Sequence, residues 1–296
     1  MNMKITTNYQ FNLHKSNLSQ NNKYKNPTFA ANNKFLKELG GNVLIASSAA
    51  MLAAELLKMS KSSDAGIIET TIEPQRLESF FKEAGLKFQR NKQNGLYSIN
   101  TFDGSKERYQ NAVKKYNINE DQLFENIQKI EGNAKFAGSG ITSLGNLHTI
   151  GGCAYFTNSE VTDTASLAVI GCDAIFTGSK LTSSGNILNI NGCATLHNSK
   201  IEQLPNLKYI GKDLVAGNCP IKILPELIEI GRNAYFCNSN ITEANKLSKI
   251  GRDAYINDSQ LINADSLKII GRDLYCKNSK LTTLTKVKIY GTVFMS

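Results

Sequence analysis

The second half of this sequence repeats itself every 20 residues. An isoleucine recurs without insertion in eight successive units, at Ile130, Ile150, Ile170, Ile190, Ile210, Ile230, Ile250 and Ile270. A fixed period of this length is typical of a solenoid, in which a unit too small to bury its own apolar face stacks on its neighbours. We therefore predict a solenoid over residues 130–296, about 40 Å long if neighbouring strands lie about 4.8 Å apart.

Each position of the repeat has a predicted role. Glycine follows the isoleucine in six of the eight units, which indicates a corner with an unusual backbone angle or a close approach of chains. Apolar residues stand four and six positions after the isoleucine, a spacing of two that is typical of a short strand. Glycine, asparagine or aspartate then provides for a left-handed turn. We expect one short parallel strand per coil, followed by a bend and an irregular return segment.

A small polar residue recurs at the bend of every unit. Cys219 takes this place in one unit, and the others carry Ser139, Ser159, Ser179, Ser199, Ser239, Ser259 and Ser279. A serine hydroxyl at a bend can hydrogen-bond to nearby backbone groups. A catalytic nucleophile is needed once and beside a base, so the recurrence favours a structural ladder.

Composition divides the first half of the chain. Residues 1–33 are rich in Asn, Lys and Ser, which predicts a disordered tail. Residues 34–65 are expected to hold an apolar helix and a linker. The apolar run Val43–Leu57 contains Glu55 and falls short of the about 20 residues that span a bilayer. A packed or interfacial helix is favoured there, and contact of residues 43–57 with a membrane stays open.

Residues 66–129 predict a small α+β capping domain. Pro74 is suited to the first turn of a helix and Gly85 to its end. Asn94-Gly95 between two alternating runs predicts a β-hairpin, and a second helix is expected over residues 105–116. A last helix is expected after Asn119, a candidate N-cap with Gln122 as its partner. This helix would carry Leu123, Phe124, Ile127 and Ile130 inward.

The repeats resemble a known family. Residues 214–224, LVAGNCPIKIL, are similar to the leucine-rich-repeat core LxLxxNxLxxL, with Cys or Ser at the usual Asn position. The phrases ITSLGNLHTIGG and LPNLKYIGKDL also resemble the receptor L-domain type of repeat. The resemblance implies a right-handed solenoid that serves as a recognition scaffold for protein or glycan partners, and it supplies no catalytic residue. The predicted fold class is predominantly β, a parallel β solenoid of about eight leucine-rich-repeat-like coils after a small α+β or helical region.

Outward positions of the last coils are the candidate contact surface, because inward positions are fixed by packing. Tyrosine and arginine are typical of recognition surfaces, and Asp follows Arg in two coils. The candidates are Tyr235, Tyr255, Tyr275, Arg232, Arg252, Arg272, Asp253 and Asp273. Three structural interpretations compete: tyrosine is ordinary on an exposed strand, Arg and Asp columns can neutralise each other, and coil duplication copies residues without selection for binding.

Charge and cysteine content narrow the function classes. The net charge is +9, of which residues 1–40 contribute +5 from six Lys and one Glu. Residues 230–296 hold 10 basic and 5 acidic groups, a net of +5, and the interspersed aspartates disfavour nucleic acid as the partner. Six scattered cysteines lack CxxC or Cys/His spacing, which favours free thiols in a reducing compartment and predicts no metal site. With no phosphate loop and unrelated surroundings for His14, His148 and His197, we expect neither an enzyme nor a cofactor.

Three hypotheses for function follow. The preferred one is a non-enzymatic scaffold that binds a protein or glycan through its strand face. The second is a structural or self-assembling solenoid, because the closing fragment YGTVFMS looks like a bare strand edge. The third is a membrane-associated effector or surface protein that uses residues 43–57. The N-terminus lacks the apolar segment of a secretory signal, so a cytoplasmic location or export without a classical signal is expected.

Overall fold

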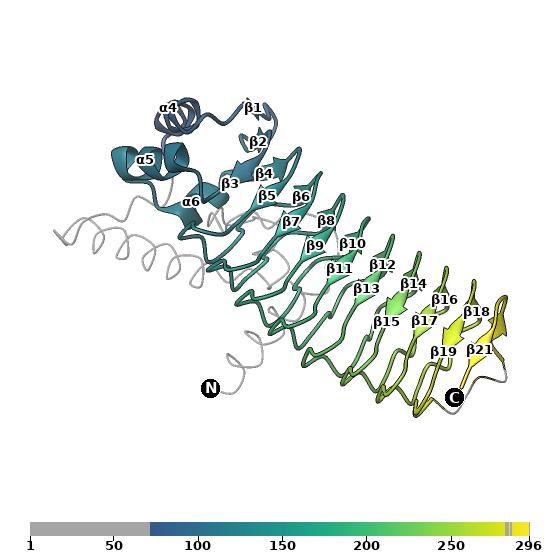
Figure 1. Ribbon diagram of the computed structural model, residues 1–296. Coiled ribbons are helices and arrows are strands. Elements are labelled where there is room, and N and C mark those ends of the chain that lie inside the picture. Colours follow the sequence, from purple (N-terminus) through teal and green to yellow (C-terminus); the bar gives the residue numbers. More distant parts are fainter. Residues whose placement is uncertain (1–71, 282–283, 285, 296) are drawn as a thin grey trace, which may run out of the picture. The chain divides into compact units, whose positions relative to one another are not determined.

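The structure is a computed structural model that describes residues 72–281, 284 and 286–295 (Figure 1). The predicted tail of residues 1–33 and the predicted apolar helix and linker of residues 34–65 lie outside the described residues. The same is true of the run Val43–Leu57. Within the part of the chain that is described, every helix is too short or too polar to cross a bilayer.

Two parallel sheets run the length of the solenoid, and each coil adds one short strand to each sheet. The first sheet contains β4 (Ile127–Ile130), β6 (Thr149–Ile150), β8 (Val169–Ile170), β10 (Asn189–Ile190), β12 (Tyr209–Ile210), β14 (Glu229–Ile230), β16 (Lys249–Ile250), β18 (Ile269–Ile270) and β20 (Lys288–Ile289). The second contains β5 (Ala134–Lys135), β7 (Ala154–Tyr155), β9 (Ala174–Ile175), β11 (Ala194–Thr195), β13 (Leu214–Val215), β15 (Ala234–Tyr235), β17 (Ala254–Tyr255), β19 (Leu274–Tyr275) and β21 (Val293–Phe294). The predicted parallel β solenoid is confirmed.

The prediction of one strand per coil was wrong, because each described coil contributes to two sheets. The strand that ends at the repeat isoleucine is only two residues long in most coils and turns a single side chain inward, so it leaves no alternation in the sequence. Successive coils pair in register at an offset of 20, as in Ile150 with Ile170. The last pairing, Leu274 with Val293, has an offset of 19.

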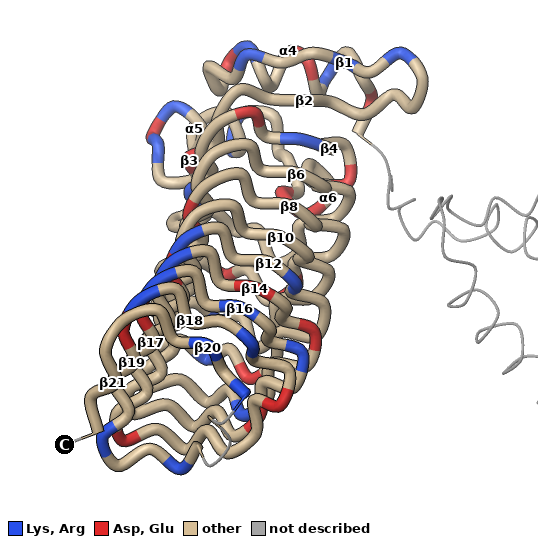
Figure 2. Tube along the Cα trace, turned by 90° about the vertical axis from the view of Figure 1, so that its right-hand side faces the viewer, with Lys and Arg blue, Asp and Glu red and all other residues tan. Residues whose placement is uncertain are grey.

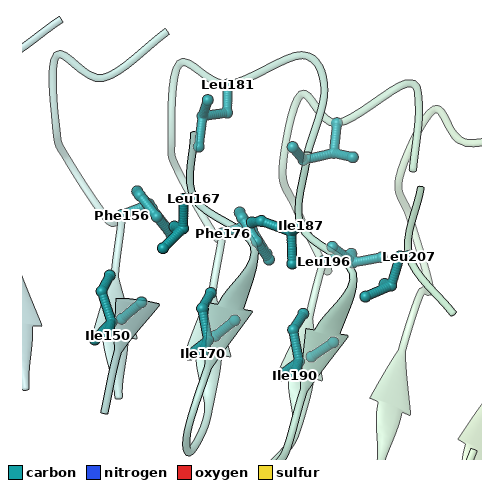
Figure 3. Close-up of a cluster of buried hydrophobic side chains, with 14 of the residues drawn as sticks. Ile150, Phe156, Leu167, Ile170, Phe176, Leu181, Ile187, Ile190, Leu196 and Leu207 are labelled. Carbon is teal, nitrogen blue, oxygen red and sulfur yellow. The ribbon is translucent and has the colours of Figure 1, made fainter. Parts of the chain in front are cut away.

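The core consists of side-chain columns that run along the solenoid (Figure 3). Ile150, Ile170 and Ile190 form one such column, and each is at most 1% exposed. The side chains four and six residues after the repeat isoleucine fill the same part of the core in each coil. Five coils of the eight place Ala first and Phe or Leu second, one places Ala and Ile, and two reverse the sizes, as Leu214 and Ala216 do. One large and one small side chain thus fill the core of each coil, because interiors are packed to a nearly constant density.

The glycine after the repeat isoleucine allows a close approach of neighbouring coils. A Cβ added at Gly231 would lie 2.2 Å from the carbonyl oxygen of Gly211, and one at Gly251 would lie 2.1 Å from that of Gly231. The unusual backbone angle occurs at the later turn instead, where all eight coils have a positive φ. Asn238 and Asp258, each with a φ of 53°, are examples.

A cap of helices and a hairpin covers the first repeats (Figure 1). Helix α4 (Pro74–Ala84) ends at Gly85 in the left-handed conformation, and α5 spans Glu107–Tyr116. Strand β1 (Phe88–Arg90) pairs antiparallel with β2 (Tyr97–Ile99), which is the expected hairpin. Because β2 pairs in parallel with β4, and β3 (Phe102–Asp103) with β5, the cap contributes a preliminary coil to both sheets.

The last helix of the cap is shorter than expected. Helix α6 (Glu120–Phe124) begins at Asn119, whose side chain accepts hydrogen bonds from two backbone N–H groups of the first turn. The sequence predicts a helix that also carries Ile127 and Ile130 inward, but these residues form β4. Pairing with β6 on one side and β2 on the other decides in favour of the strand, since Ile130 already occupies the repeat register.

Candidate recognition surface

Four aromatic rings are stacked along the outer face of the second sheet in the last coils. The ring centroids of Tyr235 and Tyr255 are 4.8 Å apart, those of Tyr255 and Tyr275 4.6 Å, and those of Tyr275 and Phe294 4.5 Å. Interplanar angles of 5–7° make the rings nearly parallel. The fourth ring was missed in the sequence, because Phe294 follows Tyr275 by 19 residues and falls outside a strict period of 20.

The stack determines which parts of the rings face outward. Each ring of Tyr255 and Tyr275 is sandwiched between two others, so these tyrosines present edges and hydroxyl groups. The Tyr255 hydroxyl donates to Oδ2 of Asp253 at 3.5 Å, and Nδ2 of Asn233 donates to the Tyr235 hydroxyl at 3.3 Å. Partial burial raises the pKa of Tyr255, and the Asp253 carboxylate raises it further, so this phenol remains neutral and a donor near pH 7.

Asp253 and Asp273 belong to a ladder of side-chain acceptors at the corner of the coils. Oδ1 of Asp253 accepts from the backbone N–H of Asp273 at 3.1 Å, and Oδ1 of Asp273 accepts from that of Thr292 at 2.8 Å. Asp213 and Asn233 bind the next coil in the same way. The side chains of Asp253 and Asp273 are 1% and 24% exposed. Their geometry fits a structural role, since each carboxylate joins its coil to the next.

A ridge of basic side chains runs beside this ladder, and Figure 2 shows basic segments on successive coils in the half that leads to the C-terminal end. The ridge consists of Lys212, Arg232, Arg252 and Arg272. Backbone hydrogen bonds place them one above another, since the N–H of Arg232 donates to Lys212, that of Arg252 to Arg232 and that of Arg272 to Arg252. Lys212, Arg252 and Arg272 are exposed and Arg232 is half-buried.

The ridge cations differ in how they are paired. The Arg272 guanidinium donates to both carboxylate oxygens of Asp253, through Nε at 2.7 Å and through Nη2. Burial of Asp253 raises its pKa, but the hydrogen bonds from Arg272 and from the backbone of Asp273 outweigh burial and hold the pKa below its ordinary value. Nε of Arg232 lies 3.9 Å from Asp213. Among the residues that the structure describes, none forms an ion pair with Arg252.

The recurrent serines lie at the bend of each coil, and all but the half-buried Ser279 are buried. Ser139 and Ser159 each donate through Oγ to the carbonyl oxygen three residues earlier, at 2.8 Å. Cys219 makes the corresponding bond at 3.1 Å. The hydroxyls of Ser179, Ser239 and Ser259 have no hydrogen-bond partner within the described residues, and Ser199 and Ser279 accept from backbone N–H groups two residues on.

A hollow of about 660 Å³ lies between two neighbouring coils of the middle region. Its lining is largely apolar and includes three prolines. The lining residues are Glu202, Gln203, Leu204, Pro205, Pro220, Lys222, Ile223 and Pro225. None of the predicted contact residues lines this hollow.

Comparison with known proteins identifies no relative, so the function proposed below is inferred from the geometry of the surface. No family model, curated protein or solved structure matches this chain.

Proposed function

We propose that this chain is a non-enzymatic scaffold that binds an acidic protein surface through a contact strip on its last coils. The contact strip comprises the stacked rings and the basic ridge: Tyr235, Tyr255, Tyr275, Phe294, Lys212, Arg232, Arg252 and Arg272. The observation that carries the proposal is the continuous stack of four rings beside exposed cationic groups. Stacked rings lose little side-chain freedom on binding, so they suit a contact surface.

The orientation of the rings favours a protein over a glycan. A sugar packs its C–H groups against the open face of an aromatic ring, and a nucleic-acid base stacks on that face as well. Both faces of Tyr255 and of Tyr275 are covered by neighbouring rings. Ring edges and hydroxyls remain available, and these suit hydrogen bonds and contacts with a protein surface.

The placement of charge favours an acidic partner. The carboxylates of Asp253 and Asp273 are held by backbone N–H groups, whereas the side chain of Arg272 is 59% exposed. Arginine outside and aspartate inside give the surface a basic outer layer. A complementary acidic patch would gain speed of association and specificity from this layer.

The leucine-rich-repeat resemblance supports the same proposal at a finer level. We propose that the coils are a short variant of that repeat, with the second sheet as its recognition face. Support comes from the parallel strands, the 20-residue offset and the buried leucine positions such as Leu214 and Leu224.

The proposal is tested by affinity capture with quantitative mass spectrometry, using the full chain and two triple variants. The first variant removes the tyrosines of the strip, with Tyr235→Ser, Tyr255→Ser and Tyr275→Ser. The matched control changes the same column in earlier coils, with Tyr155→Ser, Ile175→Ser and Val215→Ser. We expect captured acidic proteins to be lost from the first variant and kept by the control, with unchanged circular dichroism in both.

Two results would count against the proposal. Equal capture by both triple variants would remove the strip as the site. Binding of the wild-type chain to a glycan array, lost on the tyrosine changes, would move the partner from protein to glycan. A double variant, Lys212→Glu with Arg252→Glu, tests the charge separately and should weaken capture most strongly at low salt, because exposed charges are screened at high salt.

Self-association is a second candidate, favoured by exposed apolar groups on the last described strands. Tyr290, Val293, Phe294 and Met295 are 38–65% exposed, and β20 and β21 are the outermost strands of their sheets. Such an edge can pair with a second copy of this 296-residue chain. Sedimentation equilibrium tests this, and a monomer mass that does not change with concentration would contradict it.

A further inference from the structure

Three potential metal ligands meet in the second and third coils, at the corner where later coils carry the acceptor ladder and the basic ridge. The Sγ atoms of Cys153 and Cys172 and a carboxylate oxygen of Asp173 all lie within 4.8 Å of one another. All three residues are half-buried. They come from two neighbouring coils, so a sequence separation of 19 residues between the thiols becomes direct proximity.

The fold itself does not require these thiols. At the position of Cys153, six of the other seven coils place Asn or Asp, whose side-chain oxygen accepts a backbone N–H from the next coil, as Asn133 does for Cys153, and the seventh places Cys193. A cysteine is a poor substitute for that acceptor. At the position of Cys172, other coils have Gly or a basic residue. Neither packing nor the acceptor ladder therefore explains why two cysteines occur together here.

The surroundings hold the ligand set in place. Oδ1 of Asp173 accepts from the backbone N–H of Cys193 at 2.8 Å, which fixes the direction of the carboxylate. The backbone N–H of Cys153 donates to Oδ1 of Asn133 at 2.8 Å, which anchors the chain at the first thiol. Outer bonds of this kind orient the ligands in protein metal sites.

We propose that Cys153, Cys172 and Asp173 bind a thiophilic divalent cation, with Zn²⁺ as the best match. Two thiolates and one carboxylate are a ligand set that zinc accepts, and a half-buried position leaves the fourth site to water. Bonds of about 2.3 Å to sulfur and about 2.1 Å to oxygen require the ligand atoms to approach by about 1 Å. Side-chain rotation at half-buried residues supplies that movement.

Binding has a defined chemical balance and a structural consequence. Each thiol loses one proton as its sulfur bonds to Zn²⁺, so two protons are released per ion. The ion joins the second coil to the third. A cation that binds only the folded chain raises its stability by mass action, so the melting temperature should rise with zinc concentration. This site lies outside the contact strip and does not depend on the proposed function.

The experiment uses the full chain, freed of metal by a chelator, desalted and kept reduced with a phosphine. Co²⁺ is added as the probe and then displaced by Zn²⁺, with absorption and melting temperature as readouts. We expect a thiolate-to-cobalt charge-transfer band that saturates at one equivalent, disappears on adding Zn²⁺, and is lost in Cys153→Ser and in Cys172→Ser. Asp173→Asn keeps the acceptor for Cys193 and should weaken binding at least about tenfold.

Cys237→Ser is the matched control, since Cys237 is a half-buried thiol outside the ligand set, and it should leave the titration unchanged. The proposal would be overturned by a missing charge-transfer band at one equivalent, or by a band that persists in both cysteine variants. Failure of Cys237→Ser to bind would also contradict it. A Cys153–Cys172 disulfide that forms in air, with no cobalt binding after reduction, would assign the pair to redox chemistry instead.

Discussion

Exchanging the two core residues of one coil tests how the solenoid is packed. In the third coil, Ala174 and Phe176 are both fully buried and point into the core from positions two apart. The fifth coil fills the same two positions with Leu214 and Ala216, also fully buried. Both coils have neighbours with alanine first and a larger residue second, so the third coil should accept the arrangement of the fifth.

The magnitudes follow from burial and volume. Phe176→Ala alone should destabilise the chain by about 3–5 kcal/mol, because it removes a ring that stacks on Phe156 at 5.2 Å. Ala174→Leu alone should cost about 1–3 kcal/mol through overpacking. The double variant loses little more than one methylene of volume, so it should cost only about 1–2 kcal/mol. The coupling free energy between the two sites is then at least about 2 kcal/mol in favour of the pair.

Urea unfolding of the four chains, followed by circular dichroism, measures this coupling. We expect unchanged slopes of free energy against urea, with the double variant more stable than Phe176→Ala. The single substitution Thr157→Ser, in a turn of the second coil, is the control. It should change the free energy of unfolding by less than about 0.5 kcal/mol. Strictly additive effects of the two core changes would refute the idea that these positions share one space.

Three further predictions concern single residues. Gly231→Ala should lower the melting temperature strongly, because its Cβ would lie 2.2 Å from the carbonyl oxygen of Gly211; an unchanged melting curve would contradict the close approach of coils. Asp253→Asn keeps a side-chain oxygen acceptor for the N–H of Asp273 but removes the charge that Arg272 stabilises. The pKa of Asp253 is lowered in the fold from an ordinary 3.8, so its contribution to stability is present above about pH 4 and is lost as pH falls through the folded pKa. Melting curves of the wild-type chain and the variant should therefore converge in acid, and a difference that does not depend on pH would argue against the ion pair. Cys219, 2% exposed and with a pKa raised by burial, should react with a thiol reagent only on unfolding; rapid reaction in the native chain would contradict its burial.

The repeat register could be predicted from the sequence because the inward positions are restricted to apolar residues. Ile150, Ala154 and Phe156 recur at the same three places in each coil with only apolar substitutions, and the structure buries them. Strands of two residues carry too little alternation to be seen, which is why the first sheet went unpredicted. The strand over Ile127–Ile130 could not be predicted for a different reason. The residues just before it have a helical pattern, and the strands with which it pairs are distant in the sequence.

The candidate site was predicted in part. The column of Tyr235, Tyr255 and Tyr275 follows from the period alone, but stacking of the rings with their faces covered does not. Phe294 was missed because the final coil is one residue shorter. The direction of the Asp253 carboxylate could not be predicted, since an aspartate beside an arginine can point to solvent or to the next coil. The same limit hid the proximity of Cys153 and Cys172, whose separation of 19 residues resembles no familiar metal motif.

Site-specific photocrosslinking tests the proposed recognition surface most directly. Tyr255→p-azidophenylalanine keeps the aromatic ring within the stack, and Tyr155→p-azidophenylalanine places the same group in the same column of the second coil. After irradiation with a partner-containing extract, we expect a covalent adduct from residue 255 to an acidic segment of a protein, reduced by high salt, and little adduct from residue 155. Equal adducts at both positions, or adducts at residue 155 alone, would contradict recognition through the contact strip.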